Sequence, residues 1–159
     1  MFRSRAQPMT PPTTPRTLPP STKAASTVPL AVWPVAQTTA QWQRAGRYLP
    51  AVTAHPGKML PALARRIVTE YSSPGQLVVD PLAGIGTTIV EAAFLGRRAV
   101  GVELEARWVA LARENLDHML DPDRRALAEI RPGDARRLPE LLGAVAGTVD
   151  LVVTSPPYA

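Results

Sequence analysis

The tetrapeptide Ser155-Pro156-Pro157-Tyr158 places hydrogen-bond acceptors beside an aromatic ring, directly after an apolar stretch at 149–154 that predicts a buried parallel strand. Two consecutive prolines fix two φ angles and remove two backbone N–H donors. The backbone is therefore rigid, and the Ser155 hydroxyl and the carbonyl groups must face something other than a neighbouring strand. Rigid acceptors beside a flat ring suit the recognition of a planar base that carries an amino group. The alternative is a loop that the prolines merely stiffen.

A second candidate site is the loop at 80–88, Asp-Pro-Leu-Ala-Gly-Ile-Gly-Thr-Thr, which separates a predicted strand from a predicted helix. Glycines let the backbone approach a ligand closely, and a helix N-terminus offers free amide groups. Acidic residues follow the ends of three successive strands, at Asp80, Glu103 and Asp134. Because parallel strands end at the same edge of a sheet, these acids are expected around one crevice that binds a nucleoside. Each acid alone would be typical of a helix cap or a surface position.

The type of nucleoside follows from two residues of this loop region. The third glycine of a dinucleotide-binding loop is absent, because Ile89 occupies its position. The Asp80 carboxylate would repel a pyrophosphate but would favour a cationic ligand group. S-adenosylmethionine fits, since it carries an amino group and a sulfonium centre and has no phosphate. Half of a nicotinamide oxidoreductase domain is the disfavoured alternative.

Three segments resemble the amino-group DNA methyltransferases, which modify cytosine N4 or adenine N6. The loop at 80–88 looks like their cofactor loop, and Thr-Ser-Pro-Pro-Tyr at 154–158 looks like their catalytic motif. The segment His-Pro-Gly-Lys-Met-Leu-Pro at 55–61 resembles the one that precedes the loop in that family. Serine in the first position of the motif, Ser155 here, is commoner among the cytosine-N4 enzymes. A related group that methylates guanosine N2 in tRNA usually has asparagine there.

The resemblance implies a cofactor, S-adenosylmethionine, and a role for each matching residue. Glu103 would bind its ribose and Asp134 its adenine. The other cofactor-binding residues that the resemblance implies are Asp80, Leu82, Ala83, Gly84, Gly86, Thr87, Thr88, His55 and Lys58. Ser155 and the Pro156 carbonyl would hold the target amino group, and Tyr158, fixed by Pro157, would stack on a flipped base. Neither a metal nor a strong base is needed.

Charge is distributed unevenly along the 159 residues, whose net charge is +5. Residues 1–69 contain nine Lys and Arg and no Asp or Glu, whereas 70–159 contain nine Lys and Arg and thirteen Asp and Glu. A basic arm before an acidic domain favours a nucleic-acid partner, DNA before RNA, and a solubilising tail is the alternative. The absence of Cys excludes disulfides and thiolate metal sites and fits the cytoplasm. No apolar stretch approaches the length of a membrane helix.

The chain is expected to consist of a Pro-rich basic leader at 1–34 without ordered structure, a linker at 35–54 and a methyltransferase domain at 55–159. Hydrophobic periodicity in the domain predicts alternating strands and helices, and hence an α/β fold, Rossmann-like by the resemblance, with a parallel sheet. The predicted helices are 59–71, 87–95, 106–119 and 138–145, and the predicted strands are 76–80, 99–103, 126–130 and 149–153. Aromatic and cationic residues at 41–48 contact nucleic acid or pack on the core, and we expect Trp42 on the core.

Four predicted strands compare with seven in a complete methyltransferase sheet, so the resemblance implies that the N-terminal half of the fold is present. We therefore expect an N-terminal piece of a longer enzyme or a truncated product, with a second subunit or a C-terminal half to complete it. The expected function is methyl transfer to a base amino group, first of all cytosine N4 in DNA. The alternatives are a tRNA guanosine-N2 methyltransferase and a non-catalytic module that binds S-adenosylmethionine or nucleic acid.

Overall fold

A computed structural model describes residues 32–156, in which one parallel sheet has the strand order β3-β2-β1-β4. The strands are β1 (Leu77–Asp80), β2 (Arg98–Glu103), β3 (Ala128–Pro132) and β4 (Leu151–Val152). All three strand pairings are parallel, which confirms the predicted α/β sheet. Residues 1–31 of the predicted leader, and Pro157 and Tyr158 of the predicted catalytic motif, lie outside the described residues.

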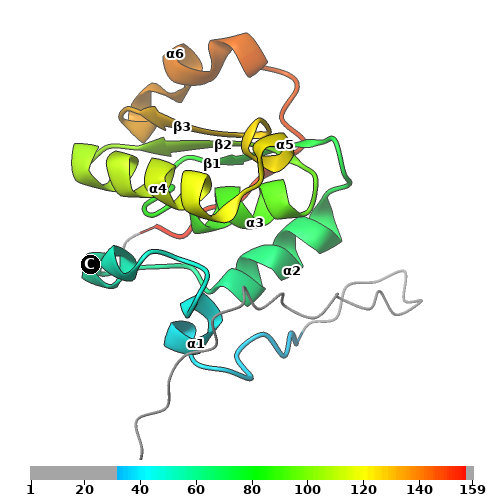
Figure 1. Ribbon diagram of the computed structural model, residues 1–159. Helices are drawn as coiled ribbons and strands as arrows, with labels where there is room; N and C mark the ends of the chain where they lie inside the picture. The colour runs from blue at the N-terminus through cyan, green and yellow to red at the C-terminus, as the bar shows by residue number, and fades with distance from the viewer. Residues whose placement is uncertain (1–31, 157–159) are drawn as a thin grey trace, which may run out of the picture.

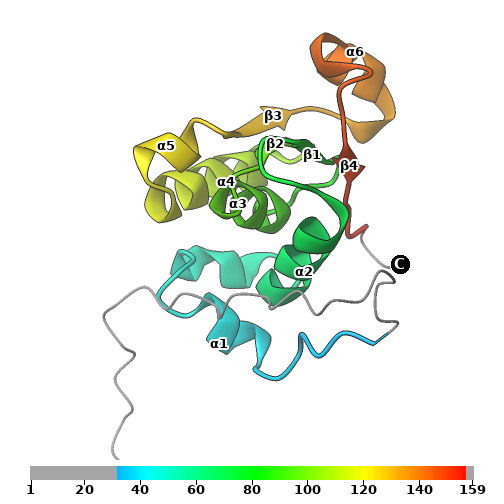
Figure 2. The same ribbon diagram turned by 90° about the vertical axis from the view of Figure 1, so that its right-hand side faces the viewer.

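The helices form layers on both sides of the sheet (Figure 1). One face carries α3 (Thr87–Phe94) and α4 (Ala106–Met119), and α2 (Pro61–Tyr71) packs on α3 from the side away from the sheet (Figure 2). The 3₁₀ turn η1 (Pro50–Ala54) lies beside α2, and α1 (Ala40–Arg44) lies further from the sheet. The opposite face carries shorter elements, which are η2 (Ala135–Arg137), α6 (Leu138–Leu142) and η3 (Gly143–Val145). A four-residue helix, α5 (Pro122–Arg125), connects α4 to β3.

Most predicted elements agree with the structure to within one or two residues. The helix predicted at 106–119 has the bounds of α4, and Gly96 follows α3 in the left-handed conformation with φ of 76°. The third strand begins two residues later than predicted, because Asp121 caps the additional helix α5 by accepting a hydrogen bond from the Arg124 N–H. The helix predicted at 138–145 ends at Leu142 and continues as η3.

Strand β1 is buried on both faces, as expected for a central parallel strand. Side chains alternate along a strand, so Val78 joins the large apolar core beneath α3 and α4 while Leu77 and Val79 join a smaller cluster on the other face. Ile89 of α3 and Leu116 of α4 are fully buried in the large core. The glycine loop and α3 are therefore supported by the better-packed side of the sheet.

Residues 40–55, called the N-terminal segment below, pack against α2 and α3 through polar side chains. The Gln43 side chain donates to the carbonyls of Val35 and Thr38 and accepts from the Ala62 N–H, all at 3.0–3.1 Å. Gln43 and Tyr48 are buried, whereas Trp42 is 44% exposed. The expectation that Trp42 packs on the core is therefore wrong, because amide hydrogen bonds rather than the indole ring seat this part of the segment.

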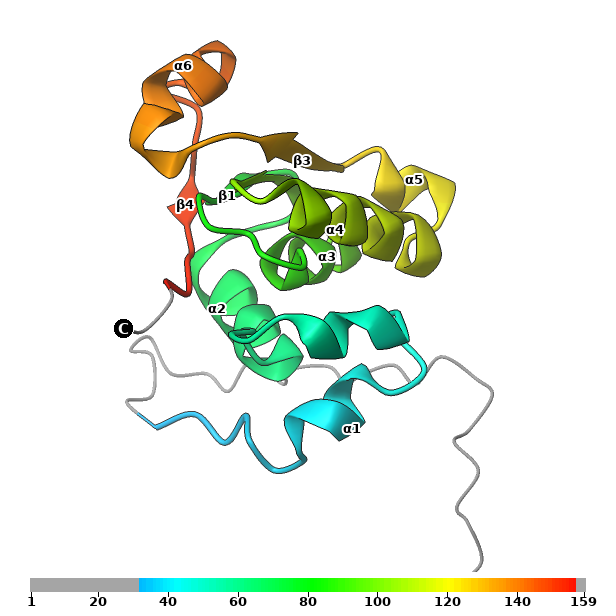
Figure 3. The same cartoon turned by 90° about the vertical axis from the view of Figure 1, so that its left-hand side faces the viewer.

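Strand β4 lies at the edge of the described sheet, beside β1 (Figure 3). The prediction of a buried strand at 149–153 is wrong in length and in burial, since β4 has two residues and Val152 is 61% exposed. At its start, the Asp150 carboxylate accepts from the Leu77 N–H at 2.7 Å. At its end, the Val153 N–H donates to the Val79 carbonyl at 2.9 Å. These bonds set the register that delivers the following residues to the end of β1.

Candidate functional site

The loop between β1 and α3 turns sharply through two glycines. Gly84 and Gly86 have φ of 53° and 82°, a region that L side chains rarely adopt. The Ala83 N–H donates to the Val102 carbonyl of β2 at 2.9 Å, and the Gly86 N–H donates to the Ala83 carbonyl at 2.8 Å. The loop is thus held against the end of β2, and a Cβ on Gly86 would lie 3.3 Å from the Ala112 side chain of α4, so this glycine also allows the loop to pack closely on α4.

Asp80, at the end of β1, is 3% exposed. Burial raises the pKa of this carboxyl, and hydrogen bonds from the Thr88 hydroxyl, the Leu82 N–H and the Thr154 hydroxyl act in the opposite direction. The Leu82 N–H lies 3.1 Å from Oδ1. A buried carboxylate that accepts a backbone hydrogen bond is a preformed partner for a cationic ligand group.

Glu103 lies at the end of β2, where its carboxylate reaches back to the glycine loop. One oxygen accepts from the Gly84 N–H at 2.9 Å, and the other accepts from the Glu105 N–H at 2.8 Å. A carboxylate oxygen has a second lone-pair direction, so both oxygens retain an acceptor site for ligand hydroxyls. The spacing of 19 residues between Gly84 and Glu103 thus corresponds to a direct contact.

Asp134 follows β3, and its carboxylate binds its own turn. It caps η2 by accepting from the Arg136 N–H and pairs with the Arg136 guanidinium at 2.5–3.0 Å. The Arg136 side chain lowers the pKa of Asp134 to about 2. Asp134 is brought to the sheet edge next to Glu103, since the Gly133 N–H donates to the Glu103 carbonyl at 2.9 Å. Its carboxylate, unlike that of Asp80, already has a side-chain cation as partner.

His55 closes the loop from the N-terminal side. A Cβ placed on Gly84 would lie 3.1 Å from Nε2 of His55, so the imidazole leaves room only for glycine. The ring also makes an edge contact with Trp108 of α4, with ring centres 4.6 Å apart. Burial lowers the pKa of His55, which favours the neutral imidazole. Lys58, whose pKa burial also lowers, donates from Nζ to the His55 carbonyl.

The other loop residues predicted to bind the cofactor differ in their surroundings. The Ala83 side chain faces β2, since a Cβ on Gly101 would lie 2.7 Å from it. Leu82 is 39% exposed. Thr87, 3% exposed at the start of α3, has a buried hydroxyl with no hydrogen-bond partner within residues 32–156. This orphaned hydroxyl, the left-handed glycine turn and the acids at two neighbouring strand ends fit a small nucleoside ligand such as S-adenosylmethionine.

The described part of the predicted catalytic motif lies directly beside this loop. Ser155 is partly buried and Pro156 is exposed, and both follow β4 at the same sheet edge as the glycine loop. The link is the pairing of β4 with β1, in which the Val153 N–H donates to the Val79 carbonyl, and the Thr154 hydroxyl that follows opposes the rise in the pKa of Asp80. Sequence reasoning missed this influence of Thr154 on Asp80, because the two residues are 74 positions apart.

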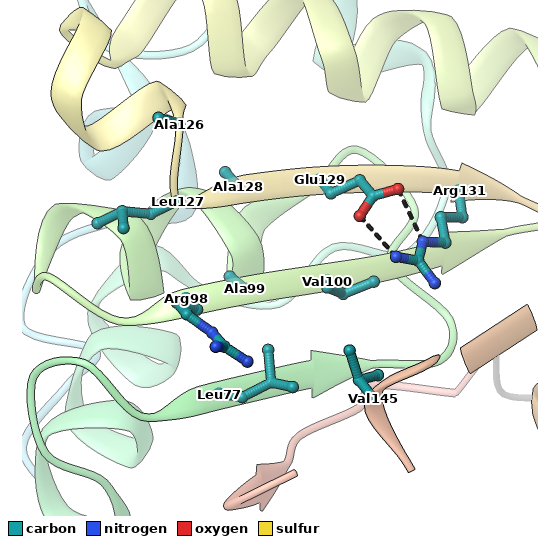
Figure 4. A pocket seen from close by; sticks show the side chains of 10 residues that line it. All are labelled: Leu77, Arg98, Ala99, Val100, Ala126, Leu127, Ala128, Glu129, Arg131 and Val145. Carbon is teal, nitrogen blue, oxygen red and sulfur yellow. Dashed lines mark hydrogen bonds and ion pairs between the residues drawn. The ribbon is translucent and has the colours of Figure 1, made fainter. Parts of the chain in front are cut away.

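A shallow groove lies on the sheet face opposite α3 and α4 (Figure 4). Its floor is apolar and includes Leu77 and Val100, and its rim carries Arg98. The two charged side chains of β3 that line it bind each other, with Arg131 donating to Glu129 at 2.7 and 2.8 Å. No cluster of three metal-ligating side chains occurs in the described range, and none of its helices is long and apolar enough to cross a membrane. The groove therefore offers less chemistry than the glycine loop.

Comparisons with known proteins point in the same direction as this geometry. Residues 4–114 match the model of a family described as DNA methylase. The tRNA (guanine(10)-N2)-dimethyltransferase of Methanothermobacter thermautotrophicus is 38% identical over 107 residues, which are 65% of this chain and 29% of that protein. The DNA adenine methyltransferase YhdJ of Escherichia coli is 36% identical over 63 residues, which are 40% of this chain and 21% of that protein. The chain thus spans less than a third of the length of these curated relatives.

Among solved structures, the crystal structure of TrmN from Thermus thermophilus superposes with a TM-score of 0.56 and 26% sequence identity. The superposition covers 69% of this chain and 32% of TrmN. The architecture of β1 to β4 with its helices is therefore that of the Rossmann-like methyltransferases.

Proposed function

Because the chain belongs to the DNA methylase family, we propose that it binds S-adenosylmethionine and takes part in methyl transfer to an exocyclic amino group of a nucleic-acid base. Members of this family are S-adenosylmethionine-dependent methyltransferases. The observation that carries the proposal is the pairing of β4 with β1, in which the Val153 N–H donates to the Val79 carbonyl at 2.9 Å. This pairing brings the chain that leads to Ser155 alongside Asp80, which follows Val79, and so supports a site shared by the glycine loop and the Ser155 segment.

The cofactor side of the proposed site uses groups that are already in place. Asp80 offers a buried carboxylate to the ammonium group of the cofactor, and Glu103 offers two acceptor sites to the ribose hydroxyls. Gly84 and Gly86 allow close approach of the backbone. When bound, S-adenosylmethionine supplies an electrophilic methyl group on a sulfonium centre. Since His55 is kept neutral by burial, it adds no positive charge beside the loop.

The base side of the proposed site compensates for a weak nucleophile. An exocyclic amino nitrogen has its lone pair delocalised into the ring, so its reactivity depends on being held and oriented. We propose that the Ser155 side chain and the Pro156 carbonyl accept the two amino hydrogens, which directs the nitrogen lone pair toward the methyl group. Tyr158 is proposed to stack on the flipped base. Methyl transfer then relies on positioning rather than on a general base.

Two substrates are supported by different observations. Ser155 and the family description favour DNA, and cytosine N4 is the first proposal. Guanine N2 in tRNA is the second, because two relatives that each match 65% of the chain are tRNA (guanine(10)-N2)-dimethyltransferases. The basic residues before Glu70 would assist binding of either polyanion.

The test is transfer of a labelled methyl group from S-adenosylmethionine to duplex DNA and to unmodified tRNA, followed by digestion to nucleosides. We expect label in N4-methylcytosine from DNA, and label in N2-methylguanosine from tRNA would establish the second substrate instead. Ser155→Ala, which removes one acceptor, should reduce transfer about 100-fold, by analogy with removal of one transition-state hydrogen bond. Cofactor binding without transfer to either polymer would indicate a binding module and contradict the proposed reaction for this chain.

A further inference from the structure

The side chain of Asn115 in α4 supports the glycine loop from beneath. Its Nδ2 group donates to the Ile85 carbonyl at 3.0 Å, and its Oδ1 accepts from the Leu49 N–H at 3.1 Å. Asn115 is fully buried. One amide therefore joins the middle of the loop to the N-terminal segment, through a buried hydrogen bond to Ile85 and a partly buried one from Leu49.

Two further contacts connect the same segment to the loop and to α3. Arg47 and Tyr48 bind the buried Glu91 of α3, with distances of 2.7 and 3.2 Å to the same carboxylate oxygen. His55 packs against Gly84 at the other end of the segment. Of these three contacts, that of Asn115 is the one that fixes a backbone carbonyl of the loop. The N-terminal segment thus forms the rear support of the glycine loop.

We propose that Asn115 is a positioning residue that holds the loop in the conformation that receives the cofactor, an inference that rests on the proposed function. The flanking Gly84 and Gly86 have access to many backbone conformations, so the loop needs an external restraint. Loss of the Asn115 amide would leave a buried carbonyl and a buried N–H unpaired. The loop relieves this cost by opening locally toward water, which withdraws the amide groups of the cofactor site.

The first test needs no ligand. In Asn115→Ala, amide hydrogen exchange of Gly86, whose N–H bonds to the Ala83 carbonyl, should become about tenfold faster. The matched control is Val68→Ala in α2, which creates a cavity in the core and lowers global stability but, since valine has no polar side-chain atom, removes no hydrogen bond to the loop. Val68→Ala should change Gly86 exchange only as far as it changes exchange throughout the sheet. Equal protection of Gly86 in the two variants would overturn the proposal.

The second test measures binding of S-adenosylhomocysteine by calorimetry at a temperature where both variants are folded. Asn115→Ala should bind about tenfold more weakly than the parent chain, whereas Val68→Ala should bind as the parent does. If the parent chain does not bind this ligand, the proposed function fails, while the exchange experiment still decides the role of Asn115. If Asn115→Ala does not fold, Asn115→Leu serves instead, because leucine has nearly the shape of asparagine and leaves no cavity while it removes both hydrogen bonds.

Discussion

The face of the sheet beneath α2, α3 and α4 buries a continuous apolar core and several polar side chains, whereas α6 and η3 cover the opposite face only in part. On the first face, Glu91 and Asn115 are fully buried and bonded. On the second face, the strands are exposed in a groove whose lining includes Arg98 of β2 and Val145 of η3. The glycine loop therefore rests on the face of the sheet that carries the continuous apolar core. The strand that leads to Ser155 depends on a few hydrogen bonds to β1.

The largest effect is expected at Glu91, on the well-packed side. Glu91→Ala leaves the guanidinium of Arg47, 6% exposed, without its carboxylate, which should cost about 3–5 kcal/mol in the free energy of unfolding. Urea unfolding followed by circular dichroism measures the loss. The control is Glu140→Ala, since Glu140 pairs with Arg137 on the surface and should contribute less than about 1 kcal/mol. Similar losses in the free energy of unfolding would show that the buried ion pair of Glu91 contributes no more than the exposed pair of Glu140. This result would contradict the difference between the two faces.

Asp150 tests the attachment of β4. Asp150→Ala removes the acceptor for the Leu77 N–H and the Gln76 side chain, with an expected loss of about 1–2 kcal/mol. Asp150→Asn keeps an acceptor oxygen and should lose less. Urea unfolding and methyl transfer, measured on the same samples, should show that Asp150→Ala impairs transfer more than S-adenosylhomocysteine binding. An equal loss of both would mean that β4 supports the cofactor loop as much as it supports Ser155.

Asp80 lies where the glycine loop and the end of β4 adjoin, and its burial disfavours the charged carboxylate. Since its pKa is raised in the folded chain, the folded state binds the proton more readily, and its contribution to stability falls as pH rises above the ordinary Asp range. Asp80→Asn should therefore stabilise the chain at neutral pH by roughly 0.5–2 kcal/mol, and the gain should vanish below about pH 4. Urea unfolding at both pH values measures it. Destabilisation at neutral pH would show that the charged carboxylate holds the fold.

The smallest effect is expected at Arg98, on the rim of the groove. Arg98→Glu should change the free energy of unfolding by no more than about 0.5 kcal/mol, because the side chain is exposed and lies on the sparsely covered face. It should leave S-adenosylhomocysteine affinity unchanged. A loss comparable to that of Asp150→Ala, measured by the same urea titration, would show that side chains on the groove face contribute more to the free energy of unfolding than their exposure indicates.

The sequence predicts those elements whose signals are local. The spacing of apolar residues and the flanking turn residues place α4 correctly, and the acid at the end of each strand locates Asp80 and Glu103. The error in β3 has a local cause as well, because Asp121 and Pro122 begin a helix where only a turn was expected.

Long-range features are harder to predict from the sequence. The exposure of β4 depends on its place at the sheet edge, the bonds of Asn115 depend on distant partners, and the influence of Thr154 on the pKa of Asp80 depends on how β4 pairs with β1. Glu91 had a usable signal, since it is the single charged residue in an otherwise apolar and Thr-containing helix, 87–94. Such an acid predicts a buried partner cation.

Calorimetric titration with S-adenosylhomocysteine, and with NAD as comparison, tests whether the glycine loop is a methyltransferase cofactor site. The geometry of Asp80, Gly84, Gly86 and Glu103 predicts one bound S-adenosylhomocysteine per chain and no binding of NAD, whose pyrophosphate would meet the Asp80 carboxylate. Absence of S-adenosylhomocysteine binding to the folded chain, or equal binding of NAD, would contradict the assignment of this loop as a methyltransferase cofactor site.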